Sequence, residues 1–168
     1  ASGSGDKTVL VYDTRTWSKV KALTDHTNDV NSVAFHPTLP LLASGSDDNT
    51  VIVYDTRTWS KVKALTDHTD YVLSVAFHPT LPLLASGSFD KTVMVYDTRT
   101  WSKVKALTDH TKGVCSIAFH PTLPLLASGS DDNTVLVYDT RTWFKVKALT
   151  DHTGSVTSVA FHPTLPLL

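Results

Sequence analysis

Residues 43–84 read ASGSDDNTVIVYDTRTWSKVKALTDHTDYVLSVAFHPTLPLL, and this 42-residue unit occurs four times in succession. The copies begin at Ala1, Ala43, Ala85 and Ala127, and 34 of the 42 positions are identical in all four. A fixed period near 40 residues is typical of repeat proteins, in which each unit buries its apolar surface against its neighbours. The fold of the chain therefore follows from the fold of one unit.

One unit is expected to form four β-strands separated by turn residues. Between Val30 and Leu65 the expected strands are Val30–Phe35, Leu41–Ser46, Thr50–Asp55 and Lys61–Leu65. The third strand is apolar on both faces, which predicts a strand covered on both sides. The fourth alternates lysine with apolar residues, as an outer edge strand does. Four-stranded sheets repeated at this period predict an all-β protein built from the blades of a β-propeller.

The chain resembles the WD40 repeat family along its whole length. In the second copy the matching residues are Asp67-His68, Leu84-Ala85-Ser86-Gly87-Ser88, Asp90 and Val95-Tyr96-Asp97. The Gly-His of the family is Asp-His here, and its Trp-Asp is Tyr-Asp. The resemblance implies a WD40-like β-propeller with four 42-residue repeats in each chain.

The resemblance also implies a buried hydrogen-bond network in each blade, formed by an Asp, a Ser or Thr, a His and an aromatic residue. By the match, one blade would use Asp48, Ser44 or Ser46, His68 and Tyr54. The residues assigned to such networks are Asp6, Asp48, Asp90, Asp132, His26, His68, His110, His152, Ser44, Ser46, Tyr12, Tyr54, Tyr96 and Tyr138.

Blades of this family are offset from the sequence repeat, so the repeats 1–42, 43–84, 85–126 and 127–168 do not coincide with blades. Whole blades are expected at 30–66, 72–108 and 114–150. A fourth would join 156–168 to 1–24, from the same chain or from a partner chain. Because WD40-like rings usually have six to eight blades, we expect a C2 homodimer that closes an eight-bladed ring.

Eight positions in each unit vary, and most lie where the resemblance places one rim of the central channel. The candidate partner-binding residues on this rim are Asp29, Asn31, Asp47, Tyr71, Leu73, Phe89, Cys115 and Asp131. Exposed aromatic residues that the fold does not require often mark contacts with partners. A peptide bound on this rim is therefore the alternative function.

Composition favours a non-catalytic protein. The net charge of -1 and the 41% hydrophobic content indicate no nucleic-acid or membrane partner. The Ser, His and Asp residues recur in every copy, which favours a structural role over a catalytic one. The two histidines of each copy have no further ligand at metal-binding spacing. We expect no enzyme, catalytic residue, metal or cofactor.

The leading expectation is a self-assembling scaffold. Near-identity of the copies suggests an engineered symmetric protein, with a recently amplified natural array as the alternative. The single cysteine, Cys115, is expected to be a free thiol. The N-terminus shows no targeting pattern, and for a natural protein we expect the cytoplasm.

Overall fold

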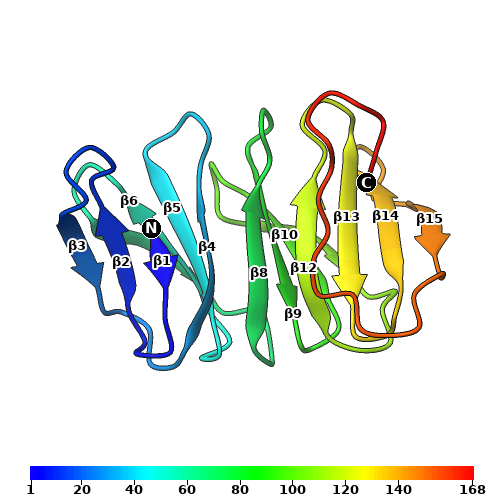
Figure 1. Cartoon of the computed structure of the whole chain (residues 1–168), viewed down its shortest axis with the longest axis horizontal. Coiled ribbons are helices and arrows are strands. Elements are labelled where there is room, and N and C mark those ends of the chain that lie inside the picture. Colours follow the sequence, from blue (N-terminus) through cyan, green and yellow to red (C-terminus); the bar gives the residue numbers. More distant parts are fainter.

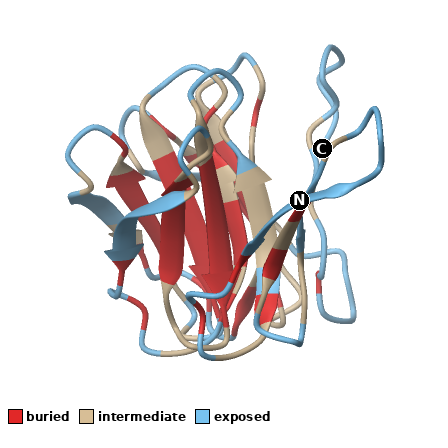
Figure 2. Ribbon diagram, turned by 90° about the vertical axis from the view of Figure 1, so that its left-hand side faces the viewer, coloured by how far each residue is buried: buried red, intermediate tan, exposed pale blue.

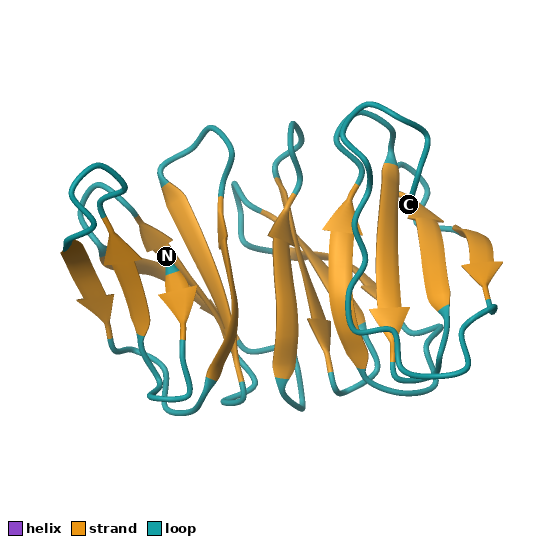
Figure 3. Cartoon of the chain, in the orientation of Figure 1, coloured by secondary structure: helices purple, strands orange, loops and turns teal.

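The computed structural model describes residues 1–168, and all of its regular elements are strands (Figure 3). None of these elements is a helix that could span a membrane. The strands are β1 (Ser2–Gly3), β2 (Val9–Tyr12), β3 (Lys19–Leu23), β4 (Val30–Phe35), β5 (Leu41–Ser46), β6 (Val51–Asp55), β7 (Ser60–Leu65), β8 (Val72–Phe77), β9 (Leu83–Ser88), β10 (Val93–Asp97), β11 (Lys103–Leu107), β12 (Val114–Phe119), β13 (Leu125–Ser130), β14 (Val135–Asp139) and β15 (Lys145–Leu149).

The strands form antiparallel sheets in which each strand pairs with its neighbours in sequence. Three sheets have four strands, in the orders β4-β5-β6-β7, β8-β9-β10-β11 and β12-β13-β14-β15. They stand side by side as blades (Figure 1). The expected all-β fold is confirmed. In the first of these blades the third strand begins at Val51 instead of Thr50, and the fourth at Ser60 instead of Lys61.

The hydrophobic core lies between the blades. Val51, Val53 and Tyr54 on β6 are fully buried, because one face of this strand packs on the preceding blade and the other on the following blade. Figure 2 shows the buried residues concentrated in the middle strands of the blades. Gly45 permits the close approach of the next blade, since a Cβ there would lie 2.7 Å from Val72 Cγ1. Stability therefore depends on contacts between neighbouring blades.

The first sheet, β1-β2-β3, has three strands and lacks an inner strand. The segment 156–161 has the sequence pattern of an inner strand, but it pairs with no sheet strand and packs on the last blade. There the Val156 N–H donates to the Ser130 carbonyl at 2.9 Å. The N- and C-termini lie toward opposite ends of the longest axis (Figure 1). The described chain is thus an open row of blades, not a ring closed on itself.

Candidate functional site

Each complete blade contains a buried network of Asp, His and Ser. His26 precedes β4, and its Nε2 lies 2.7 Å from Ser44 Oγ on β5. Its Nδ1 lies 2.8 Å from Asp48 Oδ2 in the turn after β5. The same carboxylate accepts a hydrogen bond from Thr50 Oγ1 at 2.6 Å. His68 and His110 make the equivalent contacts in the next two blades. The network ties the start of each blade to its second turn.

The assignment of His68 to the network of Asp48 is wrong. His68 pairs with Asp90 and Ser86 of the following blade, and His26 pairs with Asp48 and Ser44. The reason is that each blade begins with the His that precedes its inner strand. Of the two candidate serines, Ser44 is the one that contacts the histidine. Ser46 instead caps the turn by accepting a hydrogen bond from the Asp48 N–H at 3.0 Å.

The tyrosines of the complete blades do not extend this network by a hydrogen bond. The hydroxyls of Tyr54, Tyr96 and Tyr138 are buried and have no hydrogen-bond partner. Burial, followed by the negative charge of Asp25, raises the pKa of Tyr54 far above its ordinary value. The expected link from tyrosine to the histidine network is therefore not made by a well-formed hydrogen bond, although Ser44 and Asp25 lie near the Tyr54 hydroxyl.

The first sheet and the C-terminal segment each hold half of a fourth network. Asp6 contacts only residues of its own turn, such as Thr8, whose Oγ1 donates to it at 2.7 Å. His152, the counterpart of His26, is exposed. Tyr12, the counterpart of Tyr54, is 42% exposed, whereas Tyr54 is fully buried. The residues of the fourth blade are present, but the two parts lie at separate ends of the chain.

The candidate rim residues form contacts mainly within their own blades. Asn31 Nδ2 donates to Asp47 Oδ1 at 2.6 Å. The rings of Tyr71 and Phe89 lie with their centroids 6.4 Å apart, and both side chains are about half exposed. Asp29 lies close to Gly5 of the preceding sheet. The structure thus brings the rim residues together in pairs, not in one cluster, and Leu73 is half-buried.

Cys115 and Asp131 form a further pair of rim residues within one blade. Its Sγ lies 3.3 Å from Asp131 Oδ1 and 3.8 Å from the Gly113 carbonyl. Burial, followed by the hydrogen bond and charge of Asp131, raises the pKa of the Cys115 thiol to about 11. The thiol is therefore protonated near neutral pH and is a poor nucleophile.

Sequence reasoning missed two sets of contacts, one between neighbouring blades and one within each blade. Ser32 Oγ on β4 accepts a hydrogen bond from the Val75 N–H of the next blade at 3.1 Å. Ser74 and Ser116 repeat this contact along the chain. Lys61 Nζ lies 3.2 Å from Asp25 Oδ1, which links the outer strand of a blade to the loop before it. The signal for both sets was the identity of these residues in all four copies.

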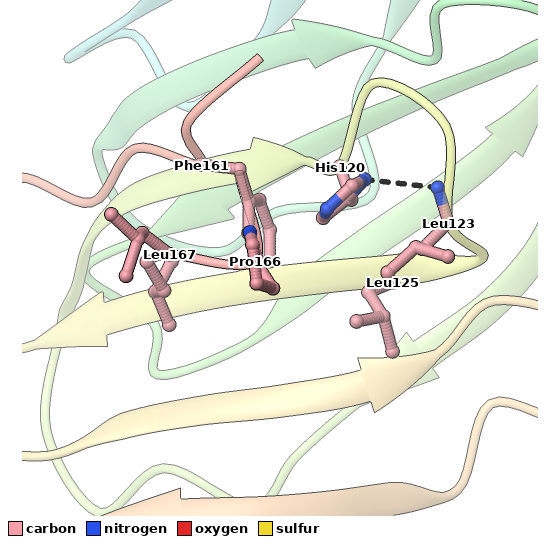
Figure 4. A pocket seen from close by; sticks show the side chains of 7 residues that line it. His120, Leu123, Leu125, Phe161, Pro166 and Leu167 are labelled. Carbon is pink, nitrogen blue, oxygen red and sulfur yellow. Dashed lines mark hydrogen bonds between the residues drawn. The ribbon is translucent and has the colours of Figure 1, made fainter. Parts of the chain in front are cut away.

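A small apolar pocket lies at the C-terminal end of the row. His120, Leu123, Leu125, Phe161, Pro166 and Leu167 lie around it (Figure 4). His120 Nδ1 accepts a hydrogen bond from the Leu123 N–H at 2.9 Å, and the rings of His120 and Phe161 lie 4.8 Å apart. The pocket holds about 160 Å³ and is formed where the C-terminal segment leaves the last complete blade.

The blades and their Asp-His-Ser networks match the model of one protein family. The model described as WD domain, G-beta repeat matches residues 17–55, 59–97, 101–139 and 143–168. The chain belongs to the WD40 family. WD40 proteins are generally non-enzymatic, and their domains typically mediate protein interactions. A comparison with curated proteins found no match.

The geometry of the WD40 network gives Ser44 no route to a substrate. A nucleophilic serine needs an exposed oxygen beside its base. Ser44 is fully buried, and the side chain of His26 is 1% exposed. The three residues satisfy one another's polar atoms inside the blade, which is a structural arrangement.

The WD40 networks are expected to make stability depend on acid pH. Burial raises the pKa of Asp48, but hydrogen bonds from Thr50, Thr27 and His26 outweigh it and hold this pKa below its ordinary value. The pKa values of Asp90 and Asp132 are lowered in the same way. A carboxyl group with a lowered pKa stabilises the folded state above its unfolded pKa, near 4, and loses this contribution as the pH falls.

We therefore expect a steep fall of the melting temperature below about pH 4, after a smaller decrease between about pH 7 and pH 5, because burial also lowers the pKa of His36 and His78 below its ordinary value. Thermal unfolding followed by circular dichroism checks this. A parallel series in about 1 M salt screens the exposed ion pairs of the outer turns, such as Asp55–Arg57. A melting temperature that stays flat from pH 5 to pH 2 would contradict the role of the buried carboxylates.

Replacing the buried tyrosines of the WD40 blades by phenylalanine is expected to stabilise the chain. Tyr96→Phe removes a buried hydroxyl that has no partner and keeps the packed ring. Relief of one unsatisfied buried group is worth about 1 kcal/mol in the free energy of unfolding. Urea unfolding measures the difference. Tyr71→Phe, at an exposed position, is the matched control and should change nothing; a loss of stability in Tyr96→Phe would show that its hydroxyl is satisfied.

Proposed function

We propose that this WD40 chain is a non-catalytic scaffold that assembles with a second copy of itself into a closed eight-bladed ring. The proposal rests on one observation. The contacts that hold each blade together and join it to the next inside the chain have unmade counterparts at its two ends. Near-identity of the copies supports an engineered symmetric origin for such a scaffold.

The polar counterparts follow the repeat period. Inside the chain, the Ser116 hydroxyl accepts from the Val159 N–H at 3.1 Å, and Lys145 pairs with Asp109 at 3.0 Å. At the ends, Ser158 is exposed and Lys19 makes no ion pair. In the proposed ring, Ser158 of one copy receives the Val33 N–H of the other. Lys19 pairs with Asp151 of that partner, and His152 joins the network of Asp6.

The apolar counterparts lie on the face of the first sheet that no blade covers. Trp17 is 76% exposed, whereas its equivalents Trp59, Trp101 and Trp143 pack partly buried against neighbouring blades. Tyr12 shows the same contrast with its buried equivalents. Covering these rings with the last blade of a second copy removes a large apolar area from water, which favours association.

The closed ring also removes an exposed sheet edge. β1 has no inner strand beside it, and the segment 156–161 has the sequence pattern of an inner strand. Addition of this segment from a second copy would satisfy the open backbone groups of β1. Two chains with four repeats each give eight blades, which lies within the range of propellers. A head-to-tail interface that closes after two copies gives a ring with no free ends.

Light scattering on a size-exclusion column across a dilution series tests the proposal. The expected result is a mass near twice the 18.3 kDa of the chain that persists on dilution into the low micromolar range. A mass of one chain at all concentrations would overturn the proposal. A mass that grows with concentration beyond two chains would also overturn it, because it indicates an open filament.

A second candidate is peptide binding on the rim, and the exposed ring pair of Tyr71 and Phe89 favours it. Asp29, Asp47 and Asp131 would attract a basic peptide to this face. Phe89→Asp discriminates the two functions. Peptide binding predicts weaker binding of a lysine-rich probe peptide with one leucine anchor, measured by fluorescence anisotropy. Ring assembly predicts an unchanged mass for the same variant.

A further inference from the structure

The near-identity of the repeats creates a problem of pairing. The inner strands β4, β8 and β12 and the segment 156–161 share almost all residues, so each carries the groups needed to join any of the four sheets. A strand that enters the wrong sheet, shifted by 42 residues, keeps its backbone ladder and its buried network. Exchange of this kind between copies produces assemblies with the wrong number of blades.

We propose that the variable rim residues select which inner strand joins which sheet. We call them register keys, and they are the pairs Asn31–Asp47, Tyr71–Phe89 and Cys115–Asp131 within blades and Gly5–Asp29 and Phe89–Gly113 between blades. The between-copy part of this inference rests on the proposed ring. The within-chain part does not.

The keys within blades are matched in chemistry. The Asn31 amide donates to Asp47 at 2.6 Å, and the Cys115 thiol donates to Asp131 at 3.3 Å. The blade that has Phe89 in place of these aspartates has an aromatic partner, Tyr71, directly before its inner strand β8, and Leu73 holds the position of Asn31 and Cys115 there. If β4 entered that blade, the Asn31 amide would face Phe89 and lose the carboxylate acceptor, which leaves it only a backbone carbonyl of the next blade, the contact that it now makes with Val72 at 3.1 Å. The within-blade keys therefore separate the blade of Phe89 from the two blades that carry Asp47 and Asp131, whose identical acceptors accept either polar partner.

The key between the second and third complete blades is steric. A Cβ on Gly113 would lie 2.7 Å from Phe89 Cδ2, which is closer than side-chain atoms approach one another. The equivalent positions in the other copies hold Asp29, Tyr71 and Ser155, all of which have a Cβ. Strand β12, which Gly113 directly precedes, therefore fits beside the blade that carries Phe89 without displacing its ring, and the other inner strands do not. Phe89 and Gly113 thus exclude the inner strands of the other copies from this position. This role needs no ligand on the rim.

A double-mutant cycle tests the steric key. Gly113→Tyr is expected to lower the melting temperature by about 5 °C, because overpacking against Phe89 forces the rim apart. Phe89→Asp alone should have little effect. The double variant recreates the combination of Asp47 with Tyr71 that the chain already contains, and it should recover most of the loss. Gly154→Tyr is the control, because a Cβ there meets nothing within 4 Å. A double variant as unstable as Gly113→Tyr alone would overturn the steric key.

A key-erased chain tests selection during assembly. In this variant the first three copies carry the rim residues of the fourth, through Gly5→Asp, Asn28→Gly, Asp29→Ser, Asn31→Thr, Asp70→Gly, Tyr71→Ser, Leu73→Thr, Phe89→Asp, Lys112→Gly, Gly113→Ser and Cys115→Thr. Both chains are unfolded in guanidinium, refolded by dilution and examined by native mass spectrometry.

The parent chain is expected to refold to one mass and the key-erased chain to several. A key-erased chain that refolds to the same single mass as the parent would overturn selection by the rim. If the parent itself has the mass of one chain, the proposed ring fails, and the double-mutant cycle still decides the keys because it needs only thermal unfolding.

Discussion

Asp90→Ala is expected to lower the free energy of unfolding by about 3 to 5 kcal/mol, a large part of the stability of a chain this size. Asp90 lies in the central complete blade with its side chain 6% exposed. Its carboxylate lies 2.7 Å from His68 Nδ1 and accepts hydrogen bonds from Thr92 Oγ1 at 2.7 Å and from the Thr69 N–H at 3.1 Å. Removing the carboxylate leaves these buried or half-buried groups without their partner, at the full cost of their desolvation.

Urea unfolding followed by tryptophan fluorescence measures this loss. Asp70→Ala in the same blade is the matched control, because the Asp70 carboxylate contacts only the neighbouring Tyr71 N–H, at 2.8 Å. The control should stay within about 1 kcal/mol of the parent. If Asp90→Ala unfolds at the same urea concentration as this control, the Asp-His-Ser network does not stabilise the blade.

Tyr12→Lys is expected to raise the dissociation constant of the proposed dimer at least about a hundredfold. Tyr12 is exposed in one chain and its counterpart Tyr54 is fully buried, so the proposed ring buries it between copies. A lysine ammonium at this place would be buried without a partner, which costs several kcal/mol. Each 1.4 kcal/mol is a factor of ten in the dissociation constant.

Val20→Lys on β3 is the matched control for this variant. Val20 is exposed, and so are its counterparts Val62, Val104 and Val146, whose blades all have a neighbour on the preceding side. A lysine there therefore stays in water in the chain and in the ring. Sedimentation velocity at several concentrations compares the two variants. Equal dissociation of Tyr12→Lys and the parent would show that the open face of β1-β2-β3 is not the surface that associates.

Most of the fold was predictable from the sequence because the same local pattern of strand and turn residues occurs in all four repeats. The alternation of Lys61, Val62 and Lys63 predicted the outer strand β7. The apolar run from Val51 to Tyr54 predicted β6, the strand that is buried on both faces. The positions of the three complete blades were also predictable, because Pro37 and Pro40 end one strand and fix where the next begins.

The choice of histidine was not predictable from the residues alone. His26 and His68 are identical in their surroundings, and they lie at nearly equal distances along the chain on either side of Asp48. Only the path of the backbone shows that His26 enters the blade of Asp48. The lack of a hydrogen-bond partner for the Tyr54 hydroxyl was not predictable either. Whether this hydroxyl contacts the network depends on the distance between strands, which the sequence pattern does not give.

The lysines of the outer strands have a consequence for the solubility of partly assembled protein. Lys63, Lys105 and Lys147 place positive charge along the outer edges β7, β11 and β15, and charged edges resist backbone pairing with other molecules. The opposite edge of the first sheet, β1, is Ser2–Gly3 and carries no charged side chain. If the copies associate in the proposed ring, conditions that separate them would uncover the uncharged edge of β1 in each chain, and aggregation should begin there and not along the lysine-bearing outer strands.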